Sequence, residues 1–127
     1  MHIERVLVID DDETSIFLIK RVLNSMDINN HAQTAPNGLE GLNVLKEAEG
    51  LEQLPQLVLL DIKMPVMDGF VFLEELEKLG NLNFNSMKIV MLSSSQNPWE
   101  IERAKSKGVT AFLHKPLSRE KLQSVIG

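Results

Sequence analysis

An α/β fold, with a five-stranded parallel sheet between two layers of helices, is predicted by two features of the chain. The first is a set of short apolar runs without polar alternation, which are typical of parallel strands covered on both faces. The second is the helical spacing of apolar residues in the segments between these runs. Strands that alternate with helices form units with right-handed crossovers, so the expected architecture is a doubly wound, flavodoxin-like three-layer sandwich.

Four apolar runs define the predicted strands most clearly. They occupy residues 6–9, 57–60, 89–92 and, with a weaker apolar character, 109–113. A further strand is expected around residues 31–35, although that segment is polar. The first three apolar runs each end directly before an aspartate or a serine, which places polar chemistry at the carboxyl ends of the strands.

Helical spacing fills the segments between the strands. Apolar residues recur every three or four positions in segments 16–26, 42–48 and 70–76. The Asn97–Pro98 step suits the start of a fourth helix, because proline is favoured in the first turn. Residues 117–126 are expected to form a short last helix.

Three residues beside the predicted helices have expected structural roles. Asp12 and Asp68 each precede a helical segment, and a side-chain oxygen at that position accepts hydrogen bonds from free backbone N–H groups. We therefore expect both to be N-caps rather than ligands. Trp99 is expected to pack near the start of the fourth helix, with a role in partner docking as the alternative.

Composition and charge exclude several classes of function. The chain has 127 residues, 43% hydrophobic and 24% charged, which suits one globular domain over residues 1–127. Its net charge of −5 argues against direct nucleic-acid binding. It has no cysteine, which excludes disulfides and thiolate chemistry. No apolar run approaches the ~20 residues of a membrane span, and the start lacks a secretion signal, so a cytoplasmic location without membrane contact is expected.

The residues after the predicted strands are expected to meet, because ligands of open α/β sheets bind at the carboxyl ends of the strands. These residues are the acids that begin at Asp10, then Asp61, Ser93 and Lys115. Clustered carboxylates repel one another unless a cation joins them, and Mg²⁺ prefers such oxygen ligands. A lysine and a hydroxyl suit a phosphoryl group. The pattern therefore indicates phosphoryl transfer to a carboxylate with Mg²⁺.

Four short motifs carry a family resemblance over essentially the whole chain. They are Val-Ile-Asp-Asp at 8–11, Leu-Asp-Ile-Lys-Met-Pro-Val-Met-Asp-Gly at 60–69, Met-Leu-Ser-Ser at 91–94 and Lys-Pro at 115–116. An aspartate followed by Met-Pro and then Asp-Gly at this spacing is rare by chance. In their order and spacing these motifs resemble response regulator receiver domains of two-component signalling.

The resemblance implies a role for each acid of the site. Asp61 corresponds to the aspartate that is phosphorylated. Asp11 corresponds to the acid that binds Mg²⁺ directly, and Asp10 to the acid that holds it through water. The backbone carbonyl of Lys63 corresponds to a further protein ligand of the metal, beside Asp61 itself.

The resemblance also implies which residues sense the phosphoryl group. Ser93 corresponds to the hydroxyl residue that moves to the phosphoryl group, with Ser94 beside it, and Lys115 to the lysine that pairs with a phosphoryl oxygen. The Lys115–Pro116 peptide bond corresponds to one that is usually cis in the family. Phe112 corresponds to the aromatic switch residue, and as phenylalanine it has no ring hydroxyl.

As a receiver, the chain is expected to take a phosphoryl group from a sensor histidine kinase or a histidine phosphotransfer protein. It catalyses only its own phosphorylation and dephosphorylation, so it is not expected to be an enzyme in the usual sense. Phosphorylation is expected to change partner binding through the face of the fourth helix, fifth strand and fifth helix. Downstream, it acts on a separate protein if the chain is complete, or on an output domain if it is a fragment, and a phosphorylation-dependent dimer is left open.

A basic run from Glu100 to Lys121 lies on this face. A solvated helical surface is the simpler interpretation of the run, and a docking surface is the alternative.

Two other functions compete with this interpretation. The segment 10–14 also fits the Asp-x-Asp-x-Thr signature of haloacid-dehalogenase-type phosphatases, with Asp10 as nucleophile and Asp12 as acid. Those enzymes need a later acidic metal motif, and Glu120 is the single acid after Lys115. The other alternative is a receiver-like interaction module that works without phosphorylation.

Overall fold

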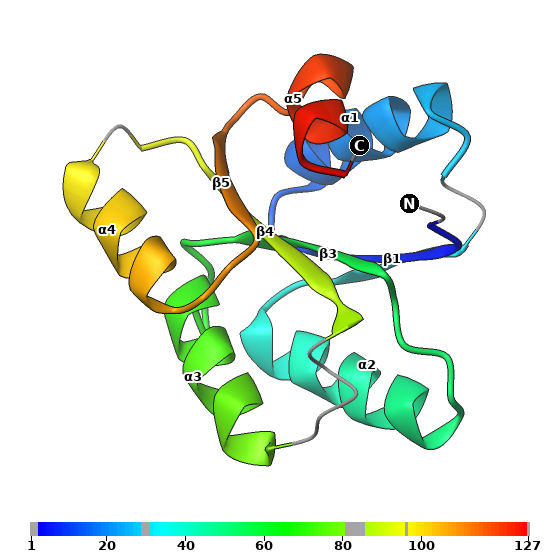
Figure 1. Cartoon of the computed structure of the whole chain (residues 1–127), viewed down its shortest axis with the longest axis vertical. Helices are drawn as coiled ribbons and strands as arrows, with labels where there is room; N and C mark the ends of the chain where they lie inside the picture. Colours follow the sequence, from blue (N-terminus) through cyan, green and yellow to red (C-terminus); the bar gives the residue numbers. More distant parts are fainter. Residues whose placement is uncertain (1–2, 29–30, 81–85, 96, 127) are drawn as a thin grey trace.

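The computed structural model describes residues 3–28, 31–80, 86–95 and 97–126, and it contains a five-stranded parallel sheet (Figure 1). The strands lie in the order β2-β1-β3-β4-β5, so the predicted fold class is confirmed. The polar strand β2 and the weakly apolar β5 are the two edges, which explains why their sequences are the least apolar. The strands are β1 (Arg5–Ile9), β2 (His31–Ala35), β3 (Leu57–Asp61), β4 (Lys88–Ser93) and β5 (Ala111–His114).

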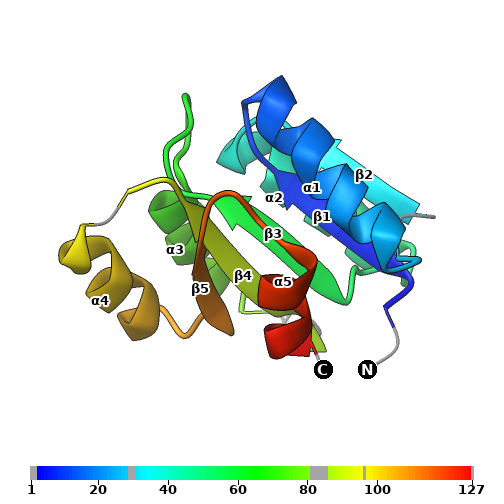
Figure 2. The same cartoon turned by 90° about the horizontal axis from the view of Figure 1, so that it is seen from above.

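Helices cover both faces of the sheet. Helices α1 and α5 lie on one face, and α2 and α3 lie on the other, with α4 beside α3 at the β5 edge (Figures 1 and 2). None of the helices in the described ranges is both long and apolar enough to cross a membrane. Their bounds are α1 (Glu13–Ser25), α2 (Gly38–Gly50), α3 (Gly69–Leu79), α4 (Pro98–Ser106) and α5 (Arg119–Ile126).

Two apolar cores, one on each face of the sheet, explain the unalternated strand sequences. Val6 and Val8 of β1 pack in the core under α1 and α5. Leu7 and Ile9 of the same strand pack in the core under α2 and α3. Successive side chains of a strand point to opposite faces, so a central strand covered on both sides is apolar throughout.

Side-chain caps start the helices where the sequence indicates. The Asp12 carboxylate accepts a hydrogen bond from the N–H of Thr14, and the Asp68 carboxylate accepts one from the N–H of Val71, so both expected caps are confirmed. The expectation for Trp99 is wrong in part: its backbone lies in the first turn of α4, but its side chain is 81% exposed and does not pack against the core.

The strand register brings the polar strand ends to one edge of the sheet. Ile9 of β1 pairs with Leu60 of β3, so Asp10 and Asp61 occupy corresponding positions just beyond this pair. Asp61 pairs with Leu92 of β4, and Ser93 pairs with His114 of β5. The four polar residues at positions 10, 61, 93 and 115 therefore lie at the carboxyl ends of their strands, on the same edge of the sheet.

Candidate functional site

Three acidic side chains cluster at the carboxyl ends of β1 and β3. Carboxylate oxygens of Asp10, Asp11 and Asp61 all lie within 4.8 Å of one another. Asp10 is 1% exposed and Asp61 is 9% exposed, whereas Asp11 faces solvent. Close carboxylates in a poorly solvated place repel one another, so this cluster requires a cation when all three are ionised.

Lys115 supplies part of that positive charge from the end of β5. Its Nζ donates a hydrogen bond to Asp10 Oδ2 at 2.9 Å and lies 3.4 Å from Asp61 Oδ1. Burial lowers the pKa of Lys115, but the hydrogen bond to Asp10 and the charges of Asp61 and Asp10 raise that pKa above its ordinary value. The lysine therefore stays charged. The peptide bond that follows it, to Pro116, is cis.

The buried carboxylate of Asp10 is held by three donors. Besides Lys115, its Oδ2 accepts the hydroxyl hydrogen bond of Ser15 at 2.7 Å, and its Oδ1 accepts the N–H of Asp12 at 2.9 Å. A buried charge needs hydrogen bonds of this kind to replace its hydration. The first turn of α1 therefore fixes the Asp10 side chain in the cluster.

Asp61 has an altered affinity for protons. Burial, and after it the charge of Asp10, raises the pKa of its carboxyl from 3.8 to about 6, against the lowering effect of Lys115 and of the N–H of Ile62. The same N–H lies 3.0 Å from Asp61 Oδ1 and fixes the side chain in place. The direction of the shift reflects the burial of Asp61 first and the neighbouring charge of Asp10 second.

The close approach of α3 to β3 explains the glycine of the Asp-Gly pair in the motif. A Cβ atom on Gly69 would lie 2.5 Å from the carbonyl oxygen of Asp61, and the N–H of Gly69 donates to the carbonyl of Ile62. Any larger residue would push α3 away from the strand end. Gly69 therefore helps to set the backbone position of Asp61.

The donor atoms of the site suit a small, hard cation. A cavity of about 200 Å³ lies beside Asp61, and its walls are mostly oxygen-bearing or charged groups. Three carboxylates face one ammonium group, which leaves net negative charge, and Mg²⁺ prefers such oxygen ligands and keeps several waters. The cavity is lined by Asp11, Asp12, Asp61, Ile62, Lys63, Ser93, Ser94, Ser95 and Lys115.

The two expected switch residues lie on adjacent strands. Ser93 is 3% exposed, and its hydroxyl donates to Glu100 of α4 at 2.9 Å. Phe112 of β5 is half-buried, and its ring packs edge-on against the ring of His114, with 5.5 Å between the centroids. Ser93 lines the cavity, whereas Phe112 pairs with Met91 of β4 in the strand register.

Comparison with known proteins decides the family. The profile of the response regulator receiver domain matches residues 6–127. The chain belongs to this family. It is 34% identical over 121 residues to the sensor histidine kinase CheAY of Helicobacter pylori, covering 95% of this chain and 14% of the kinase.

Solved structures show the same fold. A two-component response regulator from Cytophaga hutchinsonii superposes with a TM-score of 0.90 at 25% identity, covering 98% of this chain and 95% of that one. The CheX–CheY–BeF₃–Mg²⁺ complex from Borrelia burgdorferi contains a similar chain, with a TM-score of 0.80 at 25% identity over 97% and 86% of the two chains.

Sequence reasoning missed two residues of this receiver site. Ser15 bonds Asp10, and Glu100 bonds Ser93. Ser15 lies five residues after Asp10 in the first helical turn, so its contact was open to prediction from spacing. The contact of Glu100 was not, because it depends on where α4 lies relative to β4.

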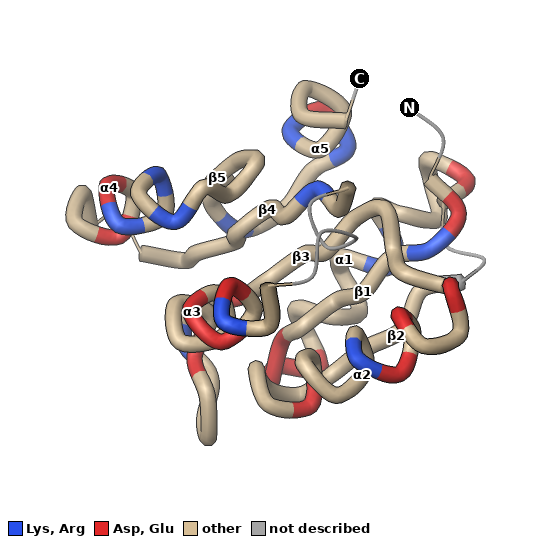
Figure 3. The backbone as a smooth tube through the Cα atoms, turned by 60° about the horizontal axis from the view of Figure 1, so that its bottom comes forward, with Lys and Arg blue, Asp and Glu red and all other residues tan. Residues whose placement is uncertain are grey.

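The basic run of the receiver is largely engaged in contacts within the chain. Arg103 stacks on the ring of Phe70 at 4.3 Å, and Lys107 pairs with Glu74 at 3.1 Å. Lys121 donates to the carbonyl oxygens of His114 and Pro116. Figure 3 shows that α4 carries both acidic and basic positions, with an acid in its first turn and the bases in its last turn. These contacts favour the interpretation of the run as a solvated helical surface over a dedicated docking surface for a partner.

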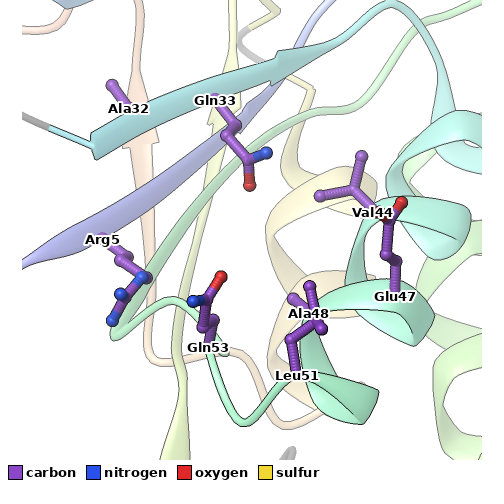
Figure 4. Close-up of a pocket in the computed structure, with 8 residues that line it drawn as sticks. All are labelled: Arg5, Ala32, Gln33, Val44, Glu47, Ala48, Leu51 and Gln53. Atoms are coloured by element: carbon purple, nitrogen blue, oxygen red, sulfur yellow. The ribbon is translucent and has the colours of Figure 1, made fainter.

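A second cavity, of about 400 Å³, lies at the opposite end of the sheet from the acid cluster (Figure 4). It borders Arg5 at the start of β1, Gln33 of the edge strand β2, and Leu51 after α2. It holds no cluster of acids and touches none of the motif residues. Although larger, it is therefore not the receiver site.

Proposed function

We propose that this receiver domain accepts a phosphoryl group on Asp61, with Mg²⁺ held by Asp11, Asp61 and the backbone carbonyl of Lys63 and, through water, by Asp10. The observation that carries the proposal is the cluster of three carboxylates and Lys115 around one small cavity. Asp61 is the acid of this cluster that both faces the cavity and touches the lysine. The Mg²⁺-containing Borrelia complex, which carries BeF₃, supports the same chemistry in a relative.

The transfer uses the carboxylate of Asp61 as nucleophile. Its oxygen forms a bond to phosphorus while the bond from phosphorus to the donor's imidazole nitrogen breaks, and that nitrogen then takes up a proton. Lys115 balances charge on the phosphoryl oxygens, and Ser93 donates a hydrogen bond to one of them. When bound, Mg²⁺ would neutralise the charge that accumulates on the phosphoryl group and the acids.

Incubation with acetyl phosphate and Mg²⁺, followed by intact-protein mass measurement, tests the proposal. We expect a gain of one phosphoryl group in the parent chain and none in Asp61→Asn, because the amide is not a nucleophile of this kind. No gain in the parent would favour the passive interaction module. Steady release of phosphate from a generic phosphomonoester would instead favour the phosphatase interpretation.

Mg²⁺ should stabilise the folded receiver. Because the unfolded chain has no assembled site, a free Mg²⁺ concentration about ten times the dissociation constant should add about 1.4 kcal/mol to the free energy of unfolding. Asp11→Asn should lose most of this gain without harming the metal-free fold, because Asp11 is exposed. Urea unfolding with Mg²⁺ or EDTA measures the effect, and Glu102→Gln, which removes an exposed acid from α4, is the control. An equal gain in Asp11→Asn would remove Asp11 from the ligand set.

We further propose that the phosphohistidine donor docks beside α1. A cavity of about 310 Å³ adjoins the acceptor cavity and shares Asp12, Ser94 and Lys115 with it. Its remaining lining is largely apolar and includes Leu18, and Phe17 next to Leu18 is 60% exposed. An apolar surface directly beside an acceptor suits a protein that must bring a histidine to Asp61. The cavity is completed by Thr14, Ser15, Ile19, Pro116 and Leu117.

Removing the apolar surface should slow phosphoryl transfer from protein donors but not from small donors. We expect the double variant Phe17→Ala and Leu18→Ala to slow transfer at least ten-fold from a histidine phosphotransfer protein that phosphorylates the parent. Its rate with acetyl phosphate should stay unchanged, because the acceptor cavity is intact. Leu51→Ala, a 60% exposed apolar residue beside the second cavity, is the matched control. Equal slowing with both donors would show that the variant damages the acceptor site instead.

A further inference from the structure

Ser93 is the centre of a closed loop of hydrogen bonds that joins the acceptor cavity to α4. Its hydroxyl oxygen accepts the N–H of Ser95 at 2.9 Å, and the hydroxyl of Ser95 accepts the N–H of Asn97 at 3.0 Å. The side chain of Asn97 then accepts the N–H of Trp99 at 3.0 Å. The next residue, Glu100, closes the loop by accepting the hydroxyl proton of Ser93 at 2.9 Å.

The bond to Glu100 competes with phosphoryl binding. A serine hydroxyl has a single proton, so it cannot donate fully to the Glu100 carboxylate and to a phosphoryl oxygen at the same time. Both acceptors are charged, and hydrogen bonds to charged acceptors are the strong ones. Ser93 is 3% exposed, so water does not readily replace either partner. Phosphorylation of Asp61 must therefore exchange one strong acceptor of Ser93 for another.

Loss of the bond to Glu100 also releases the start of α4. Glu100 lies in the first turn of this helix, next to Trp99, whose side chain is 81% exposed. Within the described residues, the Ser93–Glu100 bond is the link that closes the loop across the β4–α4 connection. Without it, the first turn of α4 is linked to Ser93 by the longer series of bonds through Ser95 and Asn97.

We infer that Glu100 is a positioning residue that holds the Ser93 side chain in place while Asp61 is unphosphorylated. After phosphorylation, the phosphoryl group takes over the hydrogen bond of Ser93 and frees the first turn of α4 with Trp99. The inference rests on the proposed phosphorylation of Asp61. By this inference, the Glu100 carboxylate opposes the movement of Ser93 toward the phosphoryl group. The exposed Trp99 side chain lies on the part of the surface that changes.

The affinity for beryllofluoride, a phosphoryl analogue that is added with Mg²⁺, measures how strongly Glu100 opposes this exchange. Titration followed by ¹⁹F NMR should show tighter binding by about five-fold in Glu100→Gln and about ten-fold in Glu100→Ala, since a hydrogen bond to a charged group is lost from the unbound state alone. Glu102→Gln, which removes an equal charge from the exposed side of the same helix, should leave the affinity unchanged.

A second cycle separates positioning from a general effect on the fold. In a Ser93→Ala background, Glu100→Gln should no longer change beryllofluoride affinity, because its partner is absent. Trp99 is the single tryptophan of the chain, so its fluorescence in Glu100→Gln without ligand should shift toward that of the beryllofluoride-bound parent. Unchanged affinity in both Glu100 variants, or an equal change in the Ser93→Ala background, would overturn the inference. Failure of the proposed function would look different, because the parent would then gain no mass from acetyl phosphate.

Discussion

Asp61→Asn should make the metal-free receiver more stable at pH 8, by about 2–3 kcal/mol in the free energy of unfolding. The physical reason is that the surroundings of Asp61 in the folded protein disfavour its ionised carboxylate. Burial and the charge of Asp10 raise the pKa of its carboxyl to about 6 from 3.8. An amide of the same shape keeps the packing and removes the repulsion.

The pH dependence of this difference has a definite sign. Below pH 3.8 the Asp61 carboxyl is neutral in both the folded and the unfolded protein, so its charge costs nothing. Between pH 3.8 and about 6 the folded protein holds the proton more tightly, and its stability falls as the pH rises. Above pH 6 the cost is complete. The advantage of Asp61→Asn should therefore be full at pH 8 and should shrink as the pH approaches 4.

Urea unfolding of both proteins in EDTA at pH 8 and at pH 4.5 measures this difference. Glu102→Gln removes one charge at an exposed position, and its effect should stay within about 0.5 kcal/mol at either pH. Saturating Mg²⁺ should narrow the gap at pH 8, because the ion compensates the carboxylates of the parent. A variant that is less stable than the parent at pH 8 would show that the acid cluster is not strained by its own charge.

The fold was largely predictable because the information is local. Each central strand is an unbroken apolar run, and each expected cap, such as Asp12 and Asp68, lies directly before its helix. The gathering of the strand ends followed from the parallel arrangement alone. The polar strand His31–Ala35 was harder to predict, because an edge strand buries less and needs fewer apolar residues.

The rest of the site depends on contacts between distant segments. The orientation of Glu100 toward Ser93 requires the exact placement of α4 on the sheet, and the exposure of Trp99 follows from the same placement. The bond from Lys115 to Asp10 joins residues 105 positions apart. Strand order places these two residues at the same edge of the sheet, on strands that are separated by β3 and β4. It does not predict that the lysine donates to Asp10 at 2.9 Å and only approaches Asp61 at 3.4 Å.

Lys115→Met should have the opposite effect on stability from Asp61→Asn. Methionine keeps the length of the side chain but removes the charge that pairs with Asp10 and Asp61. Breaking a buried ion pair from one side costs about 3–5 kcal/mol, and the 20% exposure of the Lys115 side chain lowers our expectation to about 3 kcal/mol at pH 8. The loss should be smaller in an Asp61→Asn background, where one of the two facing charges is already gone.

The phosphorylation rates of two Lys115 variants should distinguish the effect of its charge from the effect of its position. Removing one group that stabilises developing charge slows such reactions about 100-fold, which we expect for Lys115→Met with acetyl phosphate and Mg²⁺. Lys115→Arg keeps the positive charge but carries it on a wider, planar group that does not act as a compact point charge. It should therefore recover most of the stability lost in Lys115→Met while recovering little of the rate. If Lys115→Arg restores both equally, the lysine acts by its charge alone, and its two distances to Asp10 and Asp61 have no part in the transfer.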